Sequence, residues 1–169
     1  TFGDGDVEFS NITFGDGNVG FLRMVFKGLF LMRSNNNTHT IKKISFQGCV
    51  FESILILEGE FTCVPDLRGT ITKNHVDLQG LRVSPKFDGD PEKTAAALRR
   101  LKELAETNRH HEAALRYHAD EKRALRPTLP LASRWLDWCF DKLSNYGQSI
   151  GSPAFGVLAM VGAFALLYA

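Results

Sequence analysis

The chain has 169 residues, which is room for about one ordinary domain with additional segments. Its 20 basic and 19 acidic side chains leave a formal charge of +1, which excludes a general electrostatic attraction to nucleic acid. Residues 1–88 carry 10 acidic and 9 basic side chains, so this part is also too neutral to imitate DNA. Three scattered cysteines fit neither a disulfide framework nor a structural zinc site.

Residues 1–88 are rich in strand-forming residues, and apolar side chains recur there at every fifth position. The clearest run is Phe46, Phe51, Ile56 and Phe61. A spacing of five matches neither the period of a helix nor that of a strand. It predicts a square β-solenoid in which these four residues stack in a narrow core and several coils must pile up before the structure is stable. The alternative is an antiparallel β-sandwich in which the spacing is accidental.

Residues 89–127 change to helix-forming composition. Asp90 is suited to cap a helix and Pro91 to occupy its first position, and a second helix is expected to end before Pro127. We therefore expect an α-helical hairpin in this range.

Residues 128–147 predict an amphipathic interfacial helix that begins at Leu131. Trp135, Trp138 and Tyr146 lie immediately before an apolar run, and amphipathic rings are enriched where a membrane meets water. The alternative is that both tryptophans pack on the helical hairpin.

Residues 150–169 are almost wholly apolar, and twenty residues in a helix just cross a hydrocarbon core. We expect a transmembrane helix here, packed against a partner helix through its small residues; the alternative is a buried C-terminal helix of a soluble protein. Arg134 and Lys142 then place the N-terminal side in the cytoplasm by the positive-inside rule. The small residues expected at the helix–helix contact are Gly156, Ala159, Gly162 and Ala163.

Enzyme and metal chemistry have little support in the sequence. His111 and His118 lie two turns apart on one predicted helix, with Glu121 close by, but no second helix offers matching ligands. No nucleophile elbow or phosphate-binding loop is present in the sequence. We therefore expect no catalytic residue, no metal and no cofactor.

The three regions, in this order, resemble bacterial pentapeptide-repeat membrane proteins. The resemblance rests on Asp66-Leu-Arg-Gly-Thr70, on Leu98-Arg-Arg-Leu-Lys-Glu-Leu-Ala105, on His111-Glu112 leading into Tyr117 to Ala124, and on Leu143 to Ser149. It covers about residue 40 to the end, although the repeats are degenerate and one apolar span is present. It implies a right-handed quadrilateral β-helix, a helical segment and a location in the bacterial inner membrane, in some members with a channel-like C-terminus.

These expectations combine into a non-enzymatic, membrane-anchored scaffold that presents a cytoplasmic β-solenoid and serves a membrane complex. Its expected partners are the lipid bilayer and a protein, or a second copy of the chain, and not nucleic acid. The alternative function is the cytoplasmic domain and first membrane helix of an oligomeric ion-channel-like protein, which a second span beyond Ala169 would favour.

Overall fold

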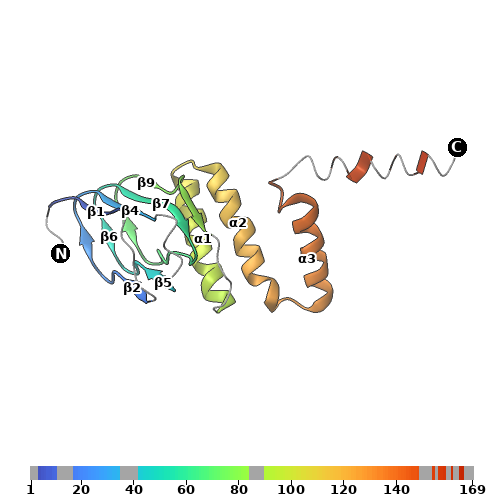
Figure 1. Cartoon of the computed structure of the whole chain (residues 1–169), viewed down its shortest axis with the longest axis horizontal. Helices are drawn as coiled ribbons and strands as arrows, with labels where there is room; N and C mark the ends of the chain where they lie inside the picture. The colour runs from blue at the N-terminus through green and yellow to red at the C-terminus, as the bar shows by residue number, and fades with distance from the viewer. Residues whose placement is uncertain are drawn as a thin grey trace. The chain divides into compact units, whose positions relative to one another are not determined.

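The computed structural model describes residues 4–10, 17–34, 42–83 and 90–148, and after these only residues 154, 156–158, 161, 164 and 165 (Figure 1). The chain divides into two compact units, Thr1–Ala124 and Leu125–Ala169. Each unit is described by itself.

The first unit contains short strands that pair only in parallel within the described residues, forming three sheets. One sheet has the order β1-β4-β7-β10, with β9 also paired to β7; the others are β2-β5 and β3-β6-β8. The strands are β1 Val7–Ser10, β2 Asn18–Gly20, β3 Val25–Phe26, β4 Phe30–Arg33, β5 Lys43–Ser45, β6 Val50–Phe51, β7 Leu55–Phe61, β8 Ile71–Thr72, β9 Val76–Asp77 and β10 Leu81–Val83.

The chain winds so that a strand pairs with a strand 21 to 25 positions further on, and we call one such return a circuit and the strands of one circuit a layer. Val7 is in register with Phe30, and Phe30 with Leu55. On the surface, side chains link successive layers: Arg33 pairs with Glu58 at 3.0 Å, a separation of 25 positions, and Lys73 pairs with Glu52, a separation of 21. A circuit is therefore longer than twenty residues, and its length varies. The difference in length falls in the turns, because the paired strands stay in register.

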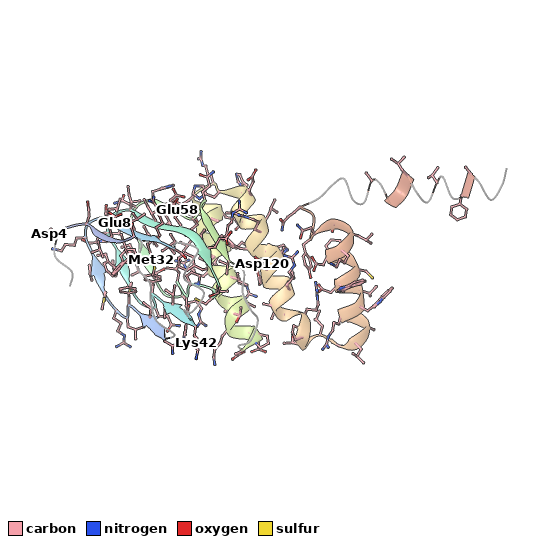
Figure 2. The ribbon with its side chains drawn as sticks, in the orientation of Figure 1. Asp4, Glu8, Met32, Lys42, Glu58 and Asp120 are labelled. Carbon is pink, nitrogen blue, oxygen red and sulfur yellow. The ribbon has the colours of Figure 1, made fainter. Side chains whose placement is uncertain are left out.

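Side chains are densely packed among the strands of the first unit (Figure 2), and the largest fully buried ones include Phe26, Phe30, Phe46 and Phe51. Phe21 stacks on Phe46 and Phe26 on Phe51, each pair with ring centroids 5.1 Å apart, so the same position is occupied by the same ring in two successive layers. Phe30 contacts all four rings edge-on and is fully buried. Such aromatic pairs contribute about 0.5–1.5 kcal/mol each beyond the area they bury.

Two segments share the sequence Asp-Leu-x-Gly, residues 66–69 and 77–80, and they form the same kind of turn. The Asp66 carboxylate accepts the amide N–H of Arg68 at 3.2 Å, and the Asp77 carboxylate accepts that of Gln79 at 2.9 Å. The leucine that follows each aspartate, Leu67 and Leu78, is completely buried. An aspartate that satisfies the backbone two residues on is a known way to fix a turn, and here it directs the leucine inward.

Two helices cover one end of the sheets in the same unit, α1 (Pro91–Thr107) and α2 (His111–Leu125) (Figure 1). The Asp90 carboxylate accepts the amides of Glu92 and Lys93, which caps α1. The helices also satisfy backbone groups of the last turns and strands: Asn108 accepts the amide of Val76 at 2.9 Å, and the Tyr117 hydroxyl donates to the carbonyls of Leu78 and Leu81, each at 3.3 Å. The hairpin is thus a lid that protects polar backbone at the end of the stacked strands.

The predicted fold class is wrong, because it requires a quadrilateral β-solenoid and a C-terminal transmembrane helix. The described residues form three parallel sheets and four helices, not a four-sided coil of five-residue edges. The five-residue spacing fails in β7, a continuous strand of seven residues. Leu55 and Leu57 are buried there and Ile56 is turned outward, because side chains in a strand alternate between faces.

The prediction of a transmembrane helix over residues 150–169 is also wrong, and so is the location in a bacterial inner membrane that depended on it. No helix among the described residues is long and apolar enough to cross a bilayer. The longest, α1, has 17 residues and several charges. Most of residues 150–169 lie outside the part of the chain that the structure describes.

Candidate interaction surface

The second unit contains a short 3-10 helix, η1 (Arg126–Thr128), followed by α3 (Leu131–Ser144). Pro130 precedes α3 with an extended conformation, so it lets the chain turn sharply between the two helices. At the other end Asn145, Tyr146 and Gly147 all have positive φ, from 48° to 86°, and the chain reverses direction there. This reversal carries Tyr146 back along the helix that it has just left.

Arg126 holds one face of α3 to the preceding segment. Its Nε donates to Asp137 at 2.7 Å, and its Nη2 donates to Asp141 at 2.6 Å and to the Tyr146 hydroxyl at 2.9 Å. The Tyr146 hydroxyl in turn donates to Asp137 at 2.7 Å. All four side chains are largely sheltered from solvent, and charge-assisted hydrogen bonds in such a place are strong.

The ionisation of this network follows its geometry. Burial lowers the pKa of Arg126, but hydrogen bonds to Asp141, Asp137 and Tyr146 outweigh it and raise the pKa overall, so the guanidinium stays charged. Burial, together with the hydrogen bond to Asp137, raises the pKa of Tyr146 to about 12. At neutral pH the network therefore contains one cation, two acidic side chains and a neutral phenol.

Outside this network most side chains of α3 are apolar and exposed. An ordinary surface helix instead buries its apolar side chains and exposes its polar ones. At helical spacing, Leu131, Trp135, Trp138 and Lys142 form one row, and Ala132, Leu136, Cys139 and Leu143 form a second row beside it. The polar row that includes Asp137 and Asp141 faces Arg126. The exposed fractions are 81% for Leu131, 64% for Trp135, 63% for Leu136, 48% for Trp138, 55% for Phe140 and 57% for Leu143.

We call this exposed group the α3 apolar face: Leu131, Trp135, Leu136, Trp138, Phe140 and Leu143. Exposed apolar side chains that are contiguous, rather than scattered singly, mark a site of interaction. The face is a continuous strip because its members lie one helical turn apart.

The membrane-interface residues predicted from the sequence separate into two kinds. Trp135 and Trp138 are exposed members of the α3 apolar face. Tyr146 is not: it is 9% exposed, its hydroxyl is bound by Arg126 and its ring packs against Phe140 at 5.8 Å.

The other predicted site residues are not part of the α3 apolar face. Of the expected core ladder, Phe46, Phe51 and Phe61 are buried, and Ile56 is half-buried. Gly156 is exposed, and among the described residues that are not its neighbours in the chain, no heavy atom lies within 4 Å of the position that a Cβ would take. Ala159, Gly162 and Ala163 lie outside the described residues.

Sequence reasoning missed the residues that orient α3, namely Arg126, Asp137 and Asp141. A signal was present: the two aspartates are four positions apart, on the side of the helix opposite Leu136. Like charges four positions apart on a helix repel each other, so a nearby cation would be favourable there. Only the structure shows that Arg126, before the helix, supplies it.

The histidines do not form a metal centre in the described part of the chain, where no three His, Cys, Asp or Glu side chains are grouped for one. His110 packs edge-on against His75 at 5.7 Å, and Glu121 is bound by Arg99 at 2.7 Å.

A cavity of about 260 Å³ lies beside Cys63 in the described part of the chain. Both of its acidic side chains are paired, Asp66 with Arg68 at 2.7 Å and Asp90 with Lys93 at 3.0 Å, and Lys42 and Lys43 also line it. Burial raises the pKa of the Cys63 thiol despite backbone hydrogen bonds that lower it. A protonated thiol is a poor nucleophile, so the cavity offers no evident chemistry.

No family model matches the chain, and comparison with curated proteins and with solved structures finds no match. The resemblance to pentapeptide-repeat membrane proteins therefore stays a prediction.

Proposed function

We propose that the protein is a non-enzymatic interaction module that binds its partner through the α3 apolar face. One observation carries the proposal: the acidic side chains of α3 are turned inward onto Arg126, while the large apolar side chains are exposed. Without a partner, α3 would be more stable with its apolar side chains buried and its acidic side chains in water. The orientation makes sense when a partner covers the apolar face.

The energy at stake is large. Fully burying a side chain of this size is worth about 1.5–3 kcal/mol, and burial against a partner recovers part of that for each of six residues. Two of the six are tryptophan, which is enriched among the residues that dominate binding energy at interfaces. The first unit is the scaffold in this proposal, because its aromatic core and its hydrogen-bonded lid make it rigid.

A photo-crosslinking residue in place of Leu136 tests the proposal in cells that express the whole chain. Leu136 is 63% exposed on the α3 apolar face. The matched control is the same residue in place of Leu115, which is 48% exposed on α2. We expect adducts, with protein or with lipid, from position 136 and not from position 115. Equal yields at the two positions, or none at either, would contradict the proposal.

A further inference from the structure

The chemistry of the α3 apolar face identifies the class of its partner. We infer that α3 lies along the surface of an anionic phospholipid layer, with its apolar face among the upper acyl chains. This inference rests on the proposed function and names the partner. It requires no helix that crosses the bilayer.

The first support is the width of the face. Two adjacent rows of α3, together with Phe140 at their edge, are apolar except for Lys142, and the remaining row is polar. A coiled-coil contact uses a narrower stripe, with about two positions in every seven. A broad apolar face is what a helix needs to lie flat in a lipid interface, where chains contact it from both sides.

The second support is the sign of the charge that remains outside. Of the four charged side chains in α3, Asp137 and Asp141 bind Arg126, and Arg134 donates to the carbonyls of Pro127 and Leu129. The fourth, Lys142, is exposed in the same row as Trp135 and Trp138. The outward charge is thus positive and adjoins two amphipathic rings. Lysine extends its ammonium group toward headgroups while its methylenes stay in apolar surroundings, and tryptophan favours the same depth. Anionic headgroups complement this arrangement.

The third support is the size of the helix. Fourteen residues span about 21 Å, so a pair of such helices buries far less than the roughly 800 Å² on each partner that a stable protein interface needs. A lipid surface needs no such minimum, because it adapts to the whole face. A second copy of the chain is therefore the weaker occupant.

The fourth support is the sequence that continues from this face. From Leu143 to Ala169 the chain carries no charged side chain. The apolar character of the α3 face thus continues into the sequence that follows it, and no acidic group there would repel an anionic surface.

The two tryptophans of the chain both lie on this face, so the intact protein reports its own binding. The experiment titrates the full chain with vesicles of phosphatidylcholine alone, and with vesicles of two parts phosphatidylcholine to one part phosphatidylglycerol. We expect tryptophan emission to shift to the blue and acrylamide quenching to fall, with tighter binding to the anionic vesicles.

Three substitutions make the test specific. Leu136→Glu is expected to weaken vesicle binding by about tenfold or more, because it replaces buried apolar surface with a charge. Leu115→Glu makes the same change on α2 and should leave binding unchanged. Lys142→Gln should weaken binding about fivefold for anionic vesicles and leave binding to phosphatidylcholine alone nearly the same. Far-ultraviolet circular dichroism confirms that each variant is folded.

The outcomes separate this inference from the proposed function. If neither vesicle changes the emission and crosslinks from position 136 join the chain to protein, the lipid inference is overturned and the interaction module stands. Concentration-dependent self-association that Leu136→Glu abolishes, without vesicle binding, overturns it in favour of a second copy. If vesicles do nothing and no crosslink forms, both fail.

Discussion

Gly59 is a residue at which we expect the first unit to tolerate little change. It lies within β7 at a φ of 103°, a region open to glycine and rarely to other residues. A Cβ at this position would lie 2.2 Å from the Ser34 carbonyl oxygen, so the backbone of the neighbouring layer also requires glycine.

Gly59→Ala is therefore expected to lower the free energy of unfolding by about 3 kcal/mol or more, combining backbone strain with a backbone clash. The control is Gly20→Ala, because the nearest heavy atom to its Cβ position is Leu22 Cγ at 4.0 Å. Urea unfolding followed by circular dichroism measures both. Equal losses in the two variants would show that the close approach to Ser34 is unimportant.

Asp66 makes the stability of the first unit depend on pH. Burial by itself raises the pKa of this carboxyl group, but hydrogen bonds and charge from Arg68 outweigh it, and the pKa in the folded state lies below the ordinary value of 3.8. A lowered folded pKa means that ionised Asp66 stabilises the fold above about pH 4, and that this contribution is lost as the pH falls through the folded pKa.

Asp66→Asn should accordingly cost about 1–2 kcal/mol of unfolding free energy at neutral pH, through the lost charge-assisted hydrogen bonds. The difference from the natural protein should shrink when unfolding is repeated at successively lower pH below 4. A gap that stays constant down to the lowest pH would mean that the charge of Asp66 is not the source of the stabilisation.

At the scale of elements, the orientation of α3 depends on a side chain outside the helix. Arg126→Gln leaves Asp137 and Asp141 close together without their cation, so we expect the second unit to lose about 2–4 kcal/mol of stability. Amide hydrogen exchange in α3 measures this local loss directly.

Lys142→Gln is the control for Arg126→Gln, because Lys142 is an exposed cation on α3 itself. Its effect on exchange should be within about 0.5 kcal/mol. Similar protection in Arg126→Gln and in the natural protein would contradict the assignment of Arg126 as the residue that orients α3.

Helices and their ends are readable from this sequence to a degree that the sheets are not. Asp90 and Pro91 predict the start of α1 correctly, because helix capping depends on residues within one turn. The orientation of α3 is not local: Arg126 acts on Asp141, fifteen positions away. A pattern search confined to the helix detects the acidic row and misses its partner.

The observed sheets differ from the predicted solenoid because the five-residue spacing does not hold in every segment. Phe46 and Phe51 are five positions apart and both buried, whereas Leu55 and Leu57 follow the two-residue alternation of a continuous strand. Five-residue spacing thus indicates repeated turns of the chain, but it does not determine the number of sheets. The candidate surface was recognised in part, through Trp135 and Trp138, because aromatic clustering is visible in sequence.

On the scale of the whole molecule, the division into two units predicts that the first folds without the second. The core rings, the turns and the hydrogen bonds between the helical lid and the strands all lie within residues 1–124. A chain ending at Ala124 should therefore show the same cooperative thermal transition, followed by circular dichroism, as this unit shows in the full chain. A broad transition, or none, would show that residues after Ala124 are needed for folding.

The repeated stacking of Phe21 on Phe46 and of Phe26 on Phe51 also bears on how such a chain can change its length. Paired strands stay in register although the number of residues between layers is not fixed. Small insertions and deletions should thus be tolerated at the turns, where they alter a corner, and not within strands, where they move every following side chain to the opposite face. Gain or loss of one complete circuit would preserve both the stacked rings and the turns. We therefore expect related proteins to differ in length by whole layers.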